Sequence, residues 1–167
     1  MYKRQALARK DRKTGVGHKN FQFNFSPKVT LEEDLERRDL TINSMAVDEN
    51  DNLIDPFNGA GDIKNKCLRP VSNAFFEDPL RALRVARFKS QLPEFYLHKT
   101  MEQALNKISS SNELSYLSSE RVWGEVSKSL EYDFQEFLQI IQTYNLDKPW
   151  FNDCLLYTSP SPRDRSL

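Results

Sequence analysis

The sequence predicts an α+β protein whose two parts meet near residue 72. Short apolar segments bounded by turn residues, typical of strands, occur only before this position, and longer segments with helical periodicity follow it. The 167 residues, 38% of them hydrophobic, suffice for one compact domain or two small ones that share a core. With only 5 Gly and 8 Pro, the chain is neither collagen-like nor a Gly/Pro-rich disordered polypeptide.

Both ends of the chain are expected to lie outside the folded part. Met1–Gln5 show no pattern, and residues 154–167 form a Ser/Pro/Arg-rich tail without an apolar face to offset the entropy cost of ordering. We expect both segments to be non-native additions and the tail to be disordered. The predicted units between them are residues 6–71, with strands and helices, and residues 72–153, with helices alone.

The first unit is expected to begin with a loop, a strand and a helix. Residues 9–20 show no periodicity and predict a mobile basic loop, whereas the alternating phenylalanines of residues 21–25 predict a strand. Thr30 and Glu33 have the spacing of a capping box, which predicts a helix from Leu31.

A hairpin is expected next, because residues 45–47 and 53–54 flank a turn-rich segment. Residues 55–61 contain Pro and two Gly and predict a loop. A short helix over residues 62–66 and a strand over residues 68–71 are expected to complete the unit.

The second unit is expected to contain helices only. No strand pattern separates its four helical segments, which lie near residues 77–91, 97–108, 118–130 and 133–144. Trp123, Phe134 and Phe137 fall at helical spacing, and we expect them in the core.

Charge is distributed unevenly, although the 24 Lys+Arg balance the 24 Asp+Glu. Residues 1–30 contain eight basic side chains and one acid, whereas residues 94–153 contain ten acids and five bases. A basic front favours contact with a polyanion such as RNA, for which the candidates are Arg9, Lys10, Arg12 and Lys13. A basic loop that is merely solvated is the alternative.

Arg38 is the first candidate ligand-binding residue. If the helix from Leu31 continues, Arg38 lies in the middle of an apolar stripe roughly 80° wide, formed by Leu31, Leu35, Ile42 and Met45. An arginine there either reaches past the core to solvent or holds an anion at the core edge. The adjacent Asp39 favours the second interpretation, and Asn43, one turn beyond Asp39, would share a polar ligand.

The second candidate lies on the helix that begins at Glu77-Asp78-Pro79, where a proline and two acids fit a helix start. After Asp78, arginines recur every third residue, at positions 81, 84 and 87. Like charges at this spacing repel by about 0.2–0.5 kcal/mol per pair. Arg81, Arg84 and Arg87 therefore predict a polyphosphate clamp, with an exposed basic face as the alternative.

Several classes of site are absent from the sequence. It contains no Walker-type Gly-rich loop, no His/Cys metal cluster and no Asp-x-Asp pair, so neither catalytic residues nor metal ligands are visible. Its 2 Cys cannot form a disulfide framework, and it shows no signal peptide and no membrane-spanning apolar stretch. We expect a cytoplasmic protein that does not enter a membrane.

Four segments resemble motifs of the class II tRNA nucleotidyltransferases, the CCA-adding enzymes, in family order and spacing. They are residues 37–46 (RRDLTINSMA, like RRDxTxNAxA), residues 55–69 (DPFNG, Asp62 and LR, like DPxxG…DL…LR), residues 77–88 (EDPLRALRVARF, like EDxxRxxRxxRF) and residues 120–128 (ERVWGEVSK, like ERxxxExxK). The similarity extends from about Ala6 to Asp153 and is greatest to the bacterial type that has an additional phosphohydrolase domain.

The resemblance implies a transferase that adds C, C and A to the tRNA 3′ end from CTP and ATP without a nucleic-acid template. It also implies nucleotide contacts by named residues. The implied roles are ribose and phosphate binding by Arg38 and Asp39, base reading by Asp78 and Arg81, and phosphate binding by Arg84 and Arg87.

The resemblance further implies that Mg²⁺ is held by Asp-x-Asp carboxylates that precede all four segments. A further family carboxylate would fall near Arg4–Gln5, where no acid stands. We therefore expect an internal part without activity of its own: the rear of a nucleotidyltransferase head domain, followed by the helical neck and the start of the body. The alternatives are a bacterial poly(A) polymerase, which shares the RRD and EDxxR elements, and a non-catalytic RNA-binding protein.

Overall fold

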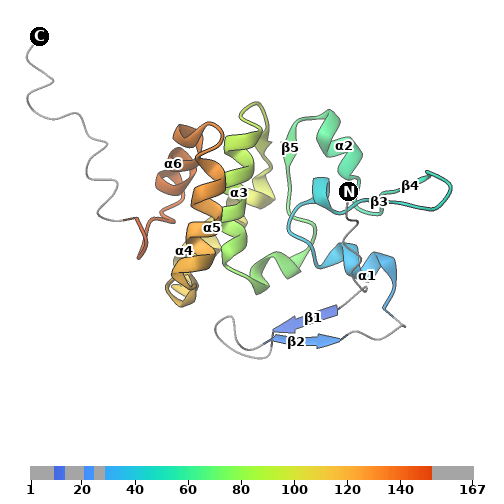
Figure 1. Ribbon diagram of the computed structural model, residues 1–167, viewed down its shortest axis with the longest axis horizontal. Coiled ribbons are helices and arrows are strands. Elements are labelled where there is room, and N and C mark those ends of the chain that lie inside the picture. The colour runs from blue at the N-terminus through green and yellow to red at the C-terminus, as the bar shows by residue number, and fades with distance from the viewer. Residues whose placement is uncertain (1–9, 14–20, 25–28, 152–167) are drawn as a thin grey trace, which may run out of the picture.

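The computed structural model describes residues 10–13, 21–24 and 29–151 of the chain (Figure 1). The expected non-native ends lie outside these residues. In chain order, the strands and helices are β1 (Lys10–Lys13), β2 (Phe21–Asn24), α1 (Leu31–Glu36), the 3₁₀ helix η1 (Thr41–Asn43), β3 (Ala46–Val47), β4 (Leu53–Ile54), α2 (Gly59–Lys64), β5 (Cys67–Leu68), η2 (Asn73–Glu77), α3 (Leu80–Gln91), β6 (Tyr96–Leu97), α4 (Lys99–Ser110), η3 (Glu113–Tyr116), α5 (Ser119–Ser129) and α6 (Phe134–Thr143).

The first two strands form an antiparallel pair in which Lys10 is opposite Asn24 and Lys13 is opposite Phe21. The strand predicted by the alternating phenylalanines is thus confirmed over residues 21–24. The loop expected over residues 9–20 is wrong for residues 10–13, which are β1. A polar segment without periodicity becomes a strand here because its backbone groups pair with those of β2.

Helix α1 begins at the predicted capping box. The Glu33 N–H donates to Thr30 Oγ1 at 3.2 Å, and the Thr30 N–H donates to Glu33 Oε2 at 3.2 Å. The expected continuation toward Met45 is wrong, because α1 ends at Glu36. The backbone beyond it pairs instead with a distant segment, as the Thr41 N–H donates to the Arg69 carbonyl at 3.1 Å.

The predicted hairpin is confirmed, with β3 antiparallel to β4. The helix that follows starts earlier than expected, because Gly59 and Gly61 lie inside α2 and not in a loop. The Asp55 carboxylate accepts the N–H groups of Gly59 at 2.7 Å and of Ala60 at 2.9 Å. These two bonds satisfy N-terminal donors that a helix leaves unpaired.

Strand β5 pairs in parallel with β6, where no strand was expected. The Tyr96 N–H donates to the Lys66 carbonyl at 2.9 Å, and the His98 N–H donates to the Leu68 carbonyl at 3.0 Å. Two residues are too short to show a periodic pattern, so β6 exists only through its partner. This pairing joins the two predicted units.

The four predicted helices of the second unit are confirmed as α3 to α6, and α3 lies beside α5 and α6 (Figure 1). Leu40 and Leu68 belong to the same core as the buried side chains of these helices. One hydrophobic core therefore extends across residue 72, and the boundary there remains a prediction. None of the described helices combines the length and apolarity of a membrane span.

The expected core position of Trp123 is wrong, since 62% of this residue is exposed. Phe137 is fully buried as expected, and Phe134 packs partly buried against the core. Helix α5 buries Val122 and Val126 instead. On a helix these positions share a face that excludes their neighbour Trp123.

Candidate functional site

A cavity of about 490 Å³ lies between the α1–η1 segment and the helices α3 and α5. Most of the residues that the sequence predicts as nucleotide ligands line it. Its lining consists of Arg37, Arg38, Asp39, Asn43, Asp78, Leu80, Arg81, Arg84, Phe88 and Arg121. Five arginines against two carboxylates give this cavity a net positive charge, which suits an anionic ligand.

Asp39 is a buried residue of this cavity and is bound by several donors. Its carboxylate accepts from Arg84 Nε at 2.7 Å, from Asn43 Nδ2 at 3.1 Å and from the Leu40 N–H at 2.9 Å. Burial by itself raises the pKa of Asp39, but the Arg84 charge and these hydrogen bonds outweigh it and lower the pKa. Asn43 thus lies beside Asp39, although through η1 and not through one continuous helix, and the polar ligand that Asn43 was expected to share remains a prediction.

Arg38 is held at the cavity edge by α1. Its Nη2 lies 3.3 Å from Asp34 Oδ2, and its Nη1 donates to the Asn43 carbonyl at 2.8 Å. Arg37 Nη2 lies 2.6 Å from the other Asp34 oxygen, so the buried Asp34 holds both arginines. The Arg38 side chain remains 39% exposed and can reach a ligand.

Arg81 is fixed by backbone carbonyl groups. It donates to the carbonyls of Arg37 at 2.5 Å, Ala74 at 2.8 Å and Arg38 at 3.3 Å. Burial lowers the pKa of Arg81 despite the nearby charge of Asp39. A guanidinium has five N–H donors, so these three bonds leave two for a ligand.

Asp78 precedes α3 in an extended conformation, with φ −127° and ψ 107°. One carboxylate oxygen accepts the Leu80 N–H at 3.2 Å, and the other accepts from Arg121 Nη2 at 2.7 Å. A carboxylate has about four acceptor sites, so each oxygen retains capacity for a ligand donor.

Of the three arginines expected to form a phosphate clamp, Arg87 lies apart from the other two, and its phosphate-binding role stays an untested prediction. Arg84 lines the cavity, but Arg87 does not, and the Arg87 side chain is only 9% exposed. Arg87 Nε lies 2.6 Å from Glu125 Oε2, and Arg87 Nη1 donates to Gln91 Oε1 at 3.0 Å. Three residues turn a helix face by about 300°, so α3 directs Arg87 toward α5 and away from the cavity.

Of the predicted RNA-binding residues, Arg9 lies outside the described residues. Lys10, Arg12 and Lys13 lie on β1, where Arg12 is opposite Gln22 of β2. The contact of these residues with RNA remains a prediction.

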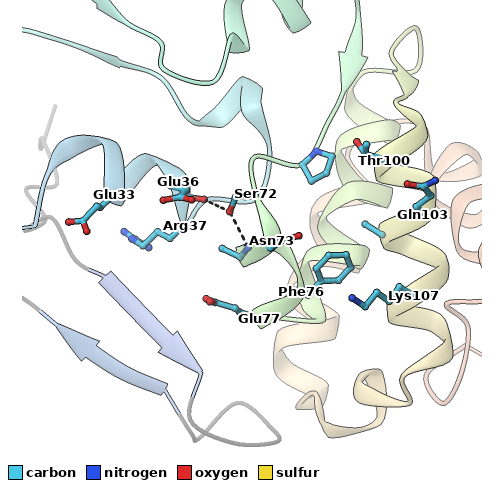
Figure 2. Close-up of a pocket in the computed structure, with 13 residues that line it drawn as sticks. Glu33, Glu36, Arg37, Ser72, Asn73, Phe76, Glu77, Thr100, Gln103 and Lys107 are labelled. Carbon is cyan, nitrogen blue, oxygen red and sulfur yellow. Dashed lines mark hydrogen bonds between the residues drawn. The ribbon is translucent and has the colours of Figure 1, made fainter.

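A second and larger cavity, about 800 Å³, lies between α1, η2 and α4 (Figure 2). Glu33, Glu36 and Glu77 line it, with Arg37 and Lys107 as the lining cations. Lys107 Nζ lies 4.3 Å from the centre of the Phe76 ring. Three carboxylates against two cations make this cavity a poorer receptor for phosphates than the first.

The described residues include no group of three or more His, Cys, Asp or Glu that could hold a metal ion. The two carboxylates of the first cavity are both bound by arginines. The residues in hand therefore do not fit a magnesium site.

Sequence reasoning missed two residues that the structure adds to the site. Arg121 lies in the ERVWGEVSK segment, so the motif was a signal, but its pairing with Asp78 spans 43 residues. Asp34 gave a signal only through its i, i+3 and i, i+4 spacing to Arg37 and Arg38.

Comparison with known proteins relates the chain to tRNA-processing enzymes. The sequence model of the Poly A polymerase head domain family matches residues 4–69. The Multifunctional CCA protein of Pseudoalteromonas atlantica is 48% identical over 162 residues, which is 94% of this chain and 40% of that protein. The protein of the same name from Vibrio cholerae is 52% identical over 140 residues, 82% of this chain and 35% of that protein.

Solved structures of CCA-adding enzymes show the same fold. One of them, a CCA-adding enzyme in its apo form II, matches 86% of this chain with a TM-score of 0.75 and 28% sequence identity. The match covers 34% of that enzyme's chain. The Thermotoga maritima enzyme complexed with tRNA matches with a TM-score of 0.66 and 31% sequence identity, covering 72% of this chain and 31% of that chain. The Bacillus stearothermophilus enzyme in complex with CTP matches with a TM-score of 0.64 and 36% sequence identity, covering 71% of this chain and 30% of that chain.

Proposed function

We propose that the whole protein adds C, C and A to the 3′ end of tRNA, because the chain belongs to the class II CCA-adding enzymes. The chain spans 40% or less of the length of the relatives named above. It would use CTP and ATP without a nucleic-acid template. The observation that carries this proposal is the cationic cavity on which Arg38, Asp39, Asp78 and Arg81 converge. The cytoplasmic location expected from the sequence remains a prediction.

Within this proposal, Asp78 and Arg81 read the base. Cytosine and adenine both present an exocyclic amine beside an unprotonated ring nitrogen. The free acceptor sites of Asp78 suit the amine, and the two remaining donors of Arg81 suit the ring nitrogen. Uracil and guanine reverse this pattern, and each mispaired buried group costs about 1–3 kcal/mol.

Arg38, Asp39, Asn43 and Arg84 hold the remainder of the nucleotide. The partly exposed side chains of Arg38 and Arg84 supply positive charge for the phosphates. Asp39 and Asn43 offer an acceptor and a donor for ribose hydroxyls. Arg87 is no longer included, because it is buried against Glu125.

Magnesium is the metal that we propose for the whole protein, since phosphoryl transfer needs charge stabilisation at the reacting phosphate. Asp39 and Asp78 do not fit that role while arginines bind them. The described residues thus bind and orient the nucleotide, and we assign them no metal-dependent step.

The deciding experiment offers tRNA that lacks its CCA end to the intact protein with Mg²⁺, CTP and ATP. We expect addition that stops after C, C and A. The 167-residue chain alone is expected to add nothing, because its sequence has no Asp-x-Asp pair and its described residues include no group of side chains that could hold the metal. An intact protein that ignores both nucleotides would contradict the proposal.

A bacterial poly(A) polymerase is the second candidate, because the matching head-domain family bears that name. The same assay separates the two activities. A polymerase would extend the RNA with ATP alone into a long tail and would not require CTP.

The strand β1 is proposed to contact tRNA phosphates, together with Arg9. Each lost phosphate contact should reduce the slope of log K against log salt by roughly one. Neutralising Lys10, Arg12 and Lys13 should therefore flatten the salt dependence of tRNA binding to the intact protein. The matched control neutralises three exposed lysines elsewhere, Lys64, Lys66 and Lys99. Equal slopes for the two variants would mean that the strand is only solvated.

A further inference from the structure

Both oxygens of Asp78 are fixed, and one of them is fixed from another helix. The Leu80 N–H holds Oδ1 at 3.2 Å, a contact that α3 supplies locally. Arg121 Nη2 holds Oδ2 at 2.7 Å and comes from the first turn of α5. Because Asp78 is extended and lies before α3, the Leu80 contact alone leaves its carboxylate free to tilt.

Arg121 itself lines the cavity and is poorly satisfied by the surrounding protein. Its side chain is 22% exposed, equal to that of Asp78. Among the described residues, its Nη1 is buried and has no hydrogen-bond partner. An unpaired buried donor is unfavourable, and an apolar side chain would pack there without that cost. Stability of the helix packing therefore does not account for this arginine.

We propose that Arg121 is a positioning residue for base selection, acting through Asp78. The inference rests on the proposed function and adds the group that aims the base-reading carboxylate. Arg121 holds Oδ2 in place, so that the carboxylate meets an exocyclic amine and not a carbonyl. Since α5 carries Arg121, the relative position of α3 and α5 becomes part of nucleotide selectivity.

The test measures kcat/KM for CTP and for UTP on tRNA that lacks its CCA end, using the intact protein. The variants are Arg121→Gln, Arg121→Lys, Asp78→Asn and the double variant Asp78→Asn/Arg121→Gln. Lys128→Gln is the matched control, because Lys128 lies on the same helix, is 58% exposed and does not line the cavity.

We expect Arg121→Gln to reduce the CTP/UTP preference about tenfold, as loss of one aligned hydrogen bond to a charged group does. Arg121→Lys should retain part of the preference, because it keeps the charge but not the planar fork. Lys128→Gln should leave the preference unchanged. In the Asp78→Asn background, Arg121→Gln should add little, since both substitutions disable one contact.

Two results would overturn the inference while the proposed function stands. One is an Arg121→Gln variant that keeps the wild-type preference, or that slows CTP and UTP by the same factor together with a lower Tm. The other is an Arg121→Gln substitution that lowers the CTP/UTP preference as much in the Asp78→Asn background as in the wild type. Arg121 would then act independently of Asp78. If Arg121→Gln fails to fold, Arg121→Lys is tested in its place. An Arg121→Lys variant whose ratio of kcat/KM for CTP over UTP equals that of the wild type would then overturn the inference. A wild-type protein that incorporates no CMP would instead contradict the proposed function, and the inference with it.

Discussion

Replacing Arg87 by methionine should destabilise the protein strongly and leave nucleotide binding to the folded protein nearly unchanged. Arg87 and Glu125 face each other at 2.6 Å, and their side chains are 9% and 5% exposed. Removing one partner of a buried pair costs about 3–5 kcal/mol, because the other charge stays buried. Methionine retains most of the aliphatic volume, so little of this loss comes from a cavity.

Two other cations near Glu125 reduce the loss of unfolding free energy that we expect for Arg87→Met. Arg84 Nη1 lies 3.8 Å and Lys128 Nζ lies 3.7 Å from Glu125 Oε1. Both remain in the variant, so we expect a loss near the lower limit, about 3 kcal/mol. For a chain of this length, that corresponds to a Tm lower by about 6–12 °C.

The assay is urea and thermal unfolding of the chain, with Lys128→Met as the matched control. Lys128 shares the same acid but is 58% exposed, so its replacement should cost less than about 1 kcal/mol. Adding Glu125→Leu to Arg87→Met should recover part of the loss, since the unpaired charge is then gone. The reasoning is refuted if Arg87→Met leaves Tm within about 2 °C of wild type while CTP affinity of the intact protein falls sharply. Arg87 would then be the phosphate ligand that the sequence predicted.

Three further predictions concern the two glycines and Asp39. Gly59→Ala should cost about 1–3 kcal/mol, because its new Cβ would collide with the Thr41 carbonyl oxygen; Gly124→Ala meets nothing within 4 Å on α5 and should gain about 0.5–1 kcal/mol. Urea unfolding checks both, and similar losses for the two would contradict the steric argument. The pKa of Asp39 is lowered in the folded state, so its charge stabilises the fold above its unfolded pKa of about 3.9, and this contribution is lost as pH falls through the folded value. Asp39→Asn should therefore be less stable than wild type near pH 7, with the difference shrinking in acid; a difference that grows below about pH 4 would contradict the sign.

Local sequence signals predicted the elements that depend on short-range contacts. The Thr30–Glu33 capping box and the four helical segments follow from spacing within a few residues, and the structure confirms them. The motif residues Arg38, Asp39, Asp78 and Arg81 could be selected as a group because their types and order are written in the chain. Asn43 reached its predicted neighbour Asp39 through a different backbone path, since both conformations bring residues four apart together.

Contacts across long sequence distances decided the rest. Strand β6 exists because Cys67–Leu68 pairs with it, and α1 stops at Glu36 because residue 41 bonds to residue 69. Trp123 is exposed and Arg87 is buried because α3 and α5 meet on one particular face of each, which helical periodicity does not specify. The sequence by itself determined which charged groups are candidates for binding a nucleotide. Only tertiary packing decided which of them face the cavity, because burial and pairing of a charge depend on neighbours supplied by other elements.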